Sequence, residues 1–202
     1  MLSNEKLNKI LDEHIGKIGT FVEIGGYDGK TLSNTYHLAN NNWKGYYFEP
    51  IIEYANKCYL NHKDNNVEVF SVGIGNEGLR QMYISEMLST LRDADYLSKI
   101  NQLEWFKDAQ FTKKDVYIAP PTILPKCDFL VIDVEGAEHE IISKMTIRPK
   151  VLMIELHEES KEWQLINNIE PLKILLENMG YNKIYSDDVD SIFIYEDTHN
   201  RA

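Results

Sequence analysis

Three carboxylates stand close together in the segment "FLVIDVEGAEHEII", residues 129–142. Asp133 follows an almost wholly apolar run typical of a buried strand, Glu135 lies in the loop after it, and Glu138 lies in the first turn of a following helix. Ligands of open α/β sheets bind at the carboxyl ends of the strands, so we expect Asp133 to contact a ligand. Glu138 fits an N-capping role, and His139 on the same helix is expected to be structural or to face solvent.

A histidine ends the next apolar run, "KVLMIELH" at 150–157. We expect His157 to lie beside Asp133, where an imidazole that titrates near neutrality could act as a general base. A histidine that merely caps the following loop is an equally good interpretation. A divalent cation on Asp133, Glu135 and His157 would be a rival way to activate a hydroxyl. The spacing does not require one, so we assign no metal ligand.

A glycine-rich stretch, "TFVEIGGYDGKT" at 20–31, joins a strand-like run to a helix-like segment. Glycines at such a turn permit positive φ angles and close approach of a ligand to the backbone. The dinucleotide fingerprint G-x-G-x-x-G, counted back from Gly29, needs a glycine where Ile24 stands. The phosphate-loop pattern G-x-x-x-x-G-K-[ST] also needs a glycine at position 24, but the chain has its glycine one residue later, at Gly25. Both nucleotide patterns therefore fail by one position.

An acidic residue ends the next strand-like run, because "YYFEP" places Glu49 twenty residues after Gly29. A carboxylate at this point can accept hydrogen bonds from both hydroxyls of a ribose. An ordinary surface acid before a proline is the alternative. Enzymes that bind NAD share this acid, so Glu49 indicates an adenosine ribose without identifying the ligand.

The hydrophobic patterns that must position these residues predict alternating strands and helices. We expect strands at 20–24, 44–50, 66–75, 79–85, 127–133, 150–157, 181–186 and 191–196. We expect helices within 1–18, 30–42, 51–62, 93–109, 136–145 and 163–181, the last one ending at Gly180, and a proline-rich loop at 116–128.

After the helix within 1–18, the next five elements follow the order β-α-β-α-β, which is typical of a doubly wound parallel sheet with right-handed crossovers. The last two strands are separated only by "DDVD". Four residues cannot form a parallel crossover, so these strands must pair antiparallel. We therefore expect a mostly parallel sheet with one reversed strand at or near its end.

The pattern Glu23-x-Gly25-x-x-x-Gly29 resembles the first motif of class I S-adenosylmethionine-dependent methyltransferases. With "FEP", "PKVLMIELH" and above all "DFLVIDVEGAEHEII", the chain resembles the FkbM family of these enzymes over roughly residues 20–160. The resemblance implies an α/β fold, a Rossmann-like seven-stranded mostly parallel sheet with the last strand antiparallel and helices on both faces. It also implies S-adenosylmethionine as cofactor and O-methylation of a small-molecule or carbohydrate acceptor.

The glycine loop is also similar to that of catechol-type O-methyltransferases, in which a tyrosine and a small hydroxyl residue line the methionine tail. Many FkbM proteins have an asparagine in this loop, where this chain has Tyr27 and Asp28. The expected catalytic residues are Asp133 and His157. The expected cofactor-binding residues are Glu23, Gly25, Tyr27, Gly29, Thr31, Glu49, Asp133 and Glu135.

Two other functions fit part of the pattern. An NAD(P)-dependent oxidoreductase would share Glu49, but the broken fingerprint and the reversed strand disfavour it. A module that binds S-adenosylmethionine without catalysis would keep the same fold, and the retention of the expected motif residues argues against it.

The segment 86–126 does not align with the family. Its expected helix carries Trp105 and Phe106, and we predict a substrate lid or a homodimer surface there. We expect one methyltransferase domain over residues 1–202.

Composition narrows the partners. The 202 residues are 43% hydrophobic, which suits a folded core, and the net charge of −11 disfavours nucleic acid as a ligand. Cys58 and Cys127 match no CxxC metal spacing. The polar start is not a signal peptide and no apolar run approaches about 18 residues, so we expect a cytoplasmic protein without a membrane span.

Overall fold

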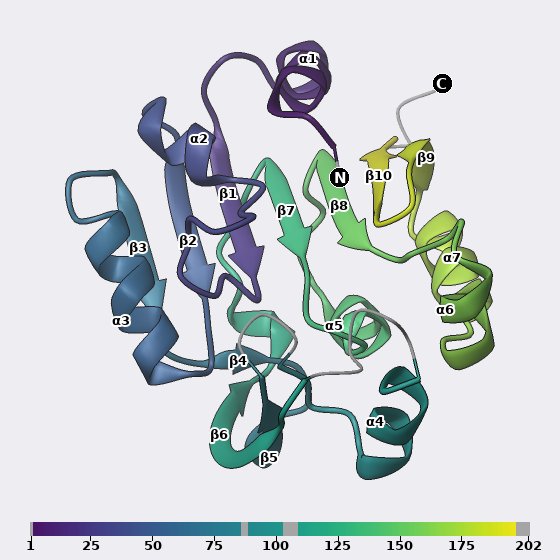
Figure 1. Cartoon of the computed structure of the whole chain (residues 1–202). Coiled ribbons are helices and arrows are strands. Elements are labelled where there is room, and N and C mark those ends of the chain that lie inside the picture. Colours follow the sequence, from purple (N-terminus) through teal and green to yellow (C-terminus); the bar gives the residue numbers. More distant parts are fainter. Residues whose placement is uncertain (1, 86–88, 103–108, 197–202) are drawn as a thin grey trace.

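A seven-stranded sheet forms the centre of the computed structural model, which describes residues 2–85, 89–102 and 109–196 (Figure 1). The strands follow the order β3-β2-β1-β7-β8-β10-β9 across the sheet. Their bounds are β1 Thr20–Ile24, β2 Lys44–Phe48, β3 Val67–Phe70, β7 Phe129–Ile132, β8 Val151–Glu155, β9 Tyr181–Ser186 and β10 Asp190–Tyr195.

All the neighbouring pairs from β3 to β8 are parallel, whereas β10 runs antiparallel to both β8 and β9. Only residues 187–189 separate β9 from β10, too few for a crossover. The predicted α/β fold is therefore confirmed: a Rossmann-like, mostly parallel seven-stranded sheet with the last strand antiparallel.

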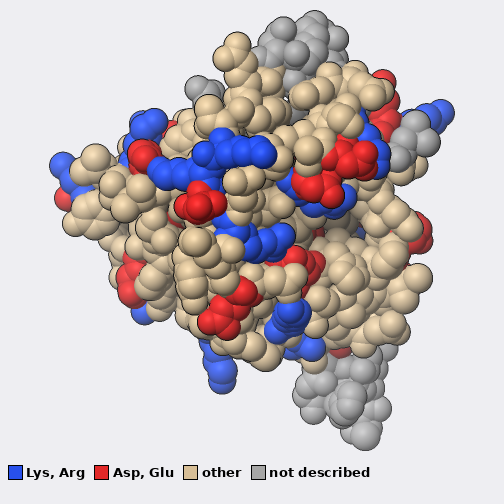
Figure 2. Space-filling view, turned by 90° about the horizontal axis from the view of Figure 1, so that it is seen from below, with Lys and Arg blue, Asp and Glu red and all other residues tan. Residues whose placement is uncertain are grey.

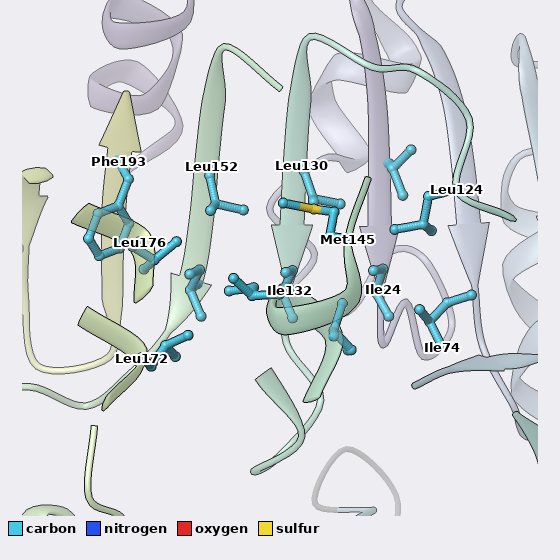
Figure 3. Close-up of a cluster of buried hydrophobic side chains, with 14 of the residues drawn as sticks. Ile24, Ile74, Leu124, Leu130, Ile132, Met145, Leu152, Leu172, Leu176 and Phe193 are labelled. Atoms are coloured by element: carbon cyan, nitrogen blue, oxygen red, sulfur yellow. The ribbon is translucent and has the colours of Figure 1, made fainter. Parts of the chain in front are cut away.

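Helices cover both faces of this sheet. The helices α1 (Asn4–His14), α2 (Tyr36–Asn40) and α3 (Ile52–Asn61) supply apolar side chains to one buried cluster. The helices α5 (Glu138–Lys144) and α7 (Glu170–Asn178) supply the other. Figure 3 shows this second cluster, in which Leu152 of a central strand and Phe193 of β10 lie near Leu176 of α7. Burial on both faces explains the nearly unbroken apolar runs of β7 and β8.

A second, three-stranded sheet lies beyond the carboxyl ends of the parallel strands (Figure 1). It pairs β4 (Gly73–Ile74), β6 (Thr112–Ala119) and β5 (Gly78–Ile84) in the order β4-β6-β5. The single strand expected at 66–75 is therefore wrong, because the chain breaks at 71–72 and continues in the other sheet. The loop expected at 116–128 is also wrong at its start. Residues 116–118 pair with β5 and residues 118–119 pair with β4, and the prolines that prevent pairing begin only at Pro120.

Two helix predictions need correction. The helix expected at 30–42 is only α2, because the side chains of Asp28 and Ser33 bind backbone N–H groups of residues 30–36 and hold this stretch in turns. The helix expected within 163–181 is two helices, α6 (Lys161–Ile166) and α7, and Pro171 stands in the first turn of α7. The predicted end of α7 at Gly180 is confirmed by its φ of +88°.

The segment 86–126 contains α4 (Ala94–Ile100), whose Tyr96, Leu97 and Ile100 pack in an apolar cluster with Trp163 of α6. A short 3-10 turn, η2 (Pro121–Ile123), leads back toward β7. Trp105 and Phe106, which carried the prediction of a lid, lie outside the described residues.

The surface carries mixed charges. Figure 2 views the molecule from the end where the parallel strands finish, and there the acidic and basic side chains of the described residues are interspersed among uncharged ones. None of the described helices is long and apolar enough to cross a membrane.

Candidate functional site

Four residues form one row across the carboxyl edge of the sheet. The strand register places four apolar residues side by side on β2, β1, β7 and β8, namely Phe48, Ile24, Ile132 and Ile154. One step further along each strand stand Glu49, Gly25, Asp133 and Glu155. Because side chains alternate along a strand, this row projects from the face that carries α1, α2 and α3. Three of the four residues are acids.

Gly25 occupies the one position of the row that has no room for a side chain. Its φ is +87°, and a Cβ atom there would lie 1.7 Å from the carbonyl oxygen of Asp133. Its N–H donates to the carbonyl of Phe48 at 3.0 Å. The glycine therefore lets the loop after β1 pass tightly between β2 and β7.

The rest of the glycine loop is held by its own side chains. Oδ1 of Asp28 accepts the N–H groups of Lys30 and Thr31, and the Thr31 hydroxyl donates to Oδ2 at 2.7 Å. Gly29 has a φ of +68°, and its carbonyl oxygen lies 2.7 Å from Nε2 of His62. A Cβ atom at Gly29 would meet the sulfur of Cys58 at 2.4 Å, so this glycine fits the loop against α3.

One cavity gathers most of the residues that the sequence pointed to. The predicted site residues that line it are Glu23, Gly25, Tyr27, Thr31, Glu49, Asp133, Glu135 and His157. Gly29, the remaining predicted residue of the glycine loop, faces His62 and does not line the cavity. At the other end the cavity is largely apolar, with walls from Ile51, Tyr54, Ile74, Met82 and Leu91.

Glu49 is buried at one side of this cavity and holds two backbone segments. Its Oε2 accepts the N–H of Tyr27 at 2.9 Å, and its Oε1 accepts the N–H of Ile51 at 2.8 Å. Each carboxylate oxygen has a second lone pair that a ligand hydroxyl can use. Burial raises the pKa of Glu49 to about 7, although both N–H groups favour the charged form.

Glu23 lies deeper, within a network of hydroxyl groups. Its Oε2 accepts hydrogen bonds from the hydroxyls of Ser33 and Thr35, and the Thr35 hydroxyl lies 2.6 Å from that of Tyr47. Burial raises the pKa of Glu23 to about 8, against the hydrogen bond from Thr35. This carboxyl group therefore keeps a proton over much of the neutral range.

Asp133, Glu155 and His157 form a connected group at the ends of β7 and β8. Burial, together with the charge and hydrogen bond of Glu155, holds the pKa of Asp133 well above its usual range. Burial and the charge of Glu135 raise the pKa of Glu155 to about 8. Oε1 of Glu155 lies 2.9 Å from Nε2 of His157, so the contacts run from Asp133 through Glu155 to His157.

His157 has a contact at each ring nitrogen. Its Nδ1 lies 3.2 Å from the carbonyl oxygen of Asp188, which can only accept, so Nδ1 carries a hydrogen. Its Nε2 then accepts a hydrogen bond from the protonated Glu155 when the pair is neutral, or donates one to the carboxylate when both are charged. Burial lowers the pKa of His157, which favours the neutral pair. The ring stacks on Trp163 at a centroid distance of 4.5 Å, which fixes its plane.

Three further acids surround this group. Glu135 has a φ of 53°, and burial with the charge of Asp133 raises its pKa. Glu138, the first residue of α5, accepts the N–H of Gly136 at 2.9 Å, whereas the N-cap position itself is Ala137 and has no side-chain cap. Asp190 of β10 stands opposite Glu155 in the antiparallel register, and burial with the charge of Asp187 raises its pKa to about 6.

A second cavity adjoins the first on the side of α6. The two share Glu135, Glu155, His157 and Trp163 as walls. The second one adds polar and charged side chains from several elements, namely Arg92, Glu138, His139, Asn167 and Asn168. His139 is exposed and lies along this wall only. The connected acids thus lie between two cavities.

The structure adds residues to the site that the sequence did not predict. Glu155 is a charged residue inside the buried run "VLMIELH", which is itself unusual and could have revealed it. Asp190 follows a turn, where acids are common. Thr35 and the apolar wall formed by Ile51, Ile74 and Met82 have no distinctive pattern, because packing from separate elements brings them together.

The chain matches known proteins at the level of family and fold. A family model described as the methyltransferase FkbM domain matches residues 23–183. A search of curated proteins found no match.

Among solved structures, the crystal structure of monomeric WbdD is similar with a TM-score of 0.53 and 13% sequence identity, over 96% of this chain and 42% of that chain. The chain thus spans less than half the length of WbdD. The precorrin-6y C5,15-methyltransferase from Geobacter metallireducens GS-15 gives a TM-score of 0.47 and 12% identity, over 97% of this chain and 90% of that one. At 13% identity, the similarity to WbdD describes the fold alone.

Proposed function

The chain belongs to the FkbM family of methyltransferases, and we propose that it transfers the methyl group of S-adenosylmethionine to a hydroxyl oxygen of a small molecule or carbohydrate. S-adenosylmethionine is the usual cofactor of this family and fold. The observation that carries the proposal is the row of Glu49, Gly25, Asp133 and Glu155 at the carboxyl edge of the sheet. In one cavity this row places Glu49, which can accept hydrogen bonds from a ribose, Gly25, which has no side chain, and the carboxyl groups of Asp133 and Glu155.

The first cavity has the chemistry that an aminoacyl nucleoside requires. Glu49 can accept the ribose hydroxyls, and the apolar wall around Ile51 and Met82 suits the adenine ring. Asp133 and Glu135, at the far side of Gly25, suit the positively charged ammonium and sulfonium groups of the methionine part. Tyr27 and Thr31, from the glycine loop, line the same cavity. These assignments make Glu23, Gly25, Tyr27, Thr31, Glu49, Asp133 and Glu135 the proposed donor-binding residues.

The second cavity suits the acceptor. It adjoins the first at Glu155 and His157, and its amide and guanidinium groups can form hydrogen bonds with a hydroxylated molecule. An acceptor held there would present its hydroxyl to the end of the donor cavity where Asp133 stands. The segment 86–126 contributes Arg92 to this cavity and Ser89 and Leu91 to the first, which supports a role in acceptor selection.

The bound donor supplies an electrophilic methyl carbon, and the products are the methyl ether, a proton and the demethylated donor. The new bond joins the acceptor oxygen to the methyl carbon as the carbon–sulfur bond breaks. The protein must hold the two in line, exclude water and take up the proton. Asp133, Glu155 and His157 together form a connected group that can take up the proton, in which burial raises the pKa of the two carboxyl groups and lowers the pKa of His157. We assign the proton uptake to Asp133 and His157, joined by Glu155.

Calorimetry with S-adenosylmethionine and S-adenosylhomocysteine tests the donor site. We expect saturable binding of both. Transfer of an isotopically labelled methyl group to a panel of alcohols and saccharides then tests the reaction. Absence of binding for both donor forms would overturn the proposal. Binding without transfer to any acceptor would favour the non-catalytic module, and enhancement of NADH fluorescence on mixing would favour the oxidoreductase.

A further inference from the structure

Three carboxylates at the junction of the two cavities are arranged as oxygen ligands of one ion. Asp133, Glu135 and Glu155 each offer an oxygen, and these three oxygens lie within 4.8 Å of one another. Around a six-coordinate ion with ligand distances of about 2.1–2.4 Å, neighbouring oxygens are about 3.0–3.4 Å apart and opposite ones about 4.2–4.8 Å apart. The cluster therefore has the dimensions of a coordination shell before any side chain moves.

A separate observation at the same place is an unsatisfied buried acid. Asp190 is only 4% exposed, and its Oδ2 has no hydrogen-bond partner among the described residues. The register pairs Asp190 with Glu155 on adjacent antiparallel strands, so both side chains project from the same face. Asp190 lines the same cavity as the three carboxylates and interacts electrostatically with Asp133 and Glu155. A buried carboxylate oxygen without a partner is costly unless a ligand satisfies it.

No cationic side chain fills this role. Among the described residues, Asp133, Glu135, Glu155 and Asp190 form no ion pair with a lysine or arginine. Arg92, the arginine of the adjoining cavity, instead donates to the carbonyl of Gly136 and lies over the ring of Tyr96. Among the described side chains, the basic group in contact with these acids is that of His157, which touches Glu155.

We propose that Asp133, Glu135 and Glu155 bind a divalent cation through one oxygen each, which leaves the second oxygens of Asp133 and Glu135 for the donor, with Asp190 as a further ligand or as the acceptor for a water of its shell. Carboxylate oxygens select hard ions such as Mg²⁺, Mn²⁺ or Ca²⁺. His157 lies at Oε1 of Glu155 and orients that carboxylate from outside the shell, as hydrogen-bonded partners of metal ligands do. The geometry thus points to Glu155 as a ligand that His157, the assigned proton acceptor, also holds in place.

The consequence for the reaction rests on the proposed function. An ion at this junction would lie where the acceptor cavity meets the donor cavity, and it could bind the acceptor hydroxyl and make its proton easier to remove. Cation binding itself does not depend on that role, because it requires neither donor nor acceptor.

Binding of Mn²⁺ to the whole chain without donor or acceptor tests the proposal. Electron paramagnetic resonance counts free Mn²⁺ during a titration, and added Mg²⁺ or Ca²⁺ should compete for the same site. We expect one saturable site in the wild type, at least about tenfold weaker binding in Glu155→Gln, and no change in Glu159→Gln. Glu159 is an exposed acid four residues along the chain and does not line either cavity, so it is the matched control.

A second variant protects the test against misfolding. Circular dichroism and S-adenosylhomocysteine binding show whether Glu155→Gln is folded, and Glu135→Gln replaces it if it is not. Absence of saturable Mn²⁺ binding, or equal binding in wild type and the folded variant, would overturn the cation site. Mn²⁺ bound without any S-adenosylhomocysteine binding would keep the site and remove the proposed function. Binding of S-adenosylhomocysteine without any binding of Mn²⁺ would remove the cation site and would mean that these acids contact only the positively charged groups of the donor.

Discussion

Nε2 of His157 lies 2.9 Å from Oε1 of Glu155, and the two side chains lie at the boundary between the two cavities. The contact links a residue that the motifs singled out to one that they missed. His157 is 8% exposed and stacked on Trp163, so it cannot turn away from Glu155 without disturbing α6. The histidine therefore acts through, or together with, the carboxylate beside it.

Replacement of His157 by alanine should lower the turnover number far more than the affinity for the donor. Loss of a general base costs about 10²- to 10⁴-fold, whereas the donor contacts assigned to Glu49 and the glycine loop stay intact. Steady-state kinetics and calorimetry with S-adenosylhomocysteine measure the two effects separately. His14→Ala, at the end of α1 and outside both cavities, is the matched control. Unchanged turnover in His157→Ala would refute its catalytic role.

Replacement of Glu49 by alanine should weaken binding of S-adenosylhomocysteine by about 100-fold or more. Two hydrogen bonds to a charged acceptor contribute about 1.5–3 kcal/mol each, and the Tyr27 N–H also loses its partner. Calorimetry measures the change. Glu53→Ala is the control, because Glu53 lies one turn further along the chain and pairs with Lys114 outside the cavity. Affinity within threefold of wild type would exclude Glu49 as a ribose ligand.

Replacement of Gly25 by alanine should destabilise the fold more than the same change at Gly16. Both glycines have positive φ angles, but only Gly25 has a carbonyl oxygen 1.7 Å from the added Cβ, whereas Gly16 has nothing within 4 Å. Gly16→Ala should cost about 1–3 kcal/mol of backbone strain. Gly25→Ala should cost more and abolish donor binding. Urea denaturation of the two variants compares the free energies of unfolding, and equal losses would contradict the tight passage between β2 and β7.

Glu23 should make the folded protein less stable as the pH rises. Its pKa is about 8 in the folded protein and 4.5 in the unfolded chain, so its protonated form is favoured by folding. The resulting stability is fully present below about pH 4.5 and is lost as the pH rises through about 8. Urea unfolding between pH 5 and 8.5 should show a decline in stability that Glu23→Gln reduces by several kcal/mol at the upper end. The control variant is Glu68→Gln, which changes an exposed acid of β3 and should leave the decline in stability unchanged.

The sequence alone was sufficient for the family and for most of the sheet. Buried strands such as β7 and β8 are almost uninterrupted apolar runs, and the three-residue connection of β9 to β10 allows only antiparallel pairing. The glycine pattern and the acidic motif are local features, so their spacing could be counted directly. The length of α2 could not be predicted, because the side chains of Asp28 and Ser33 compete with helix hydrogen bonds.

The pairing of residues from different strands was decided only by the tertiary structure. Glu155 joins Asp133 because β8 lies next to β7, and Asp190 joins them because the reversed strand β10 is placed beside β8. Glu155 lies in the run "PKVLMIELH" and Asp190 in no motif, and neither position by itself indicates these contacts. What the sequence determined was which acids end strands. What the fold determined was which of those ends lie side by side, since strand order and register are set by long-range packing rather than by neighbouring residues.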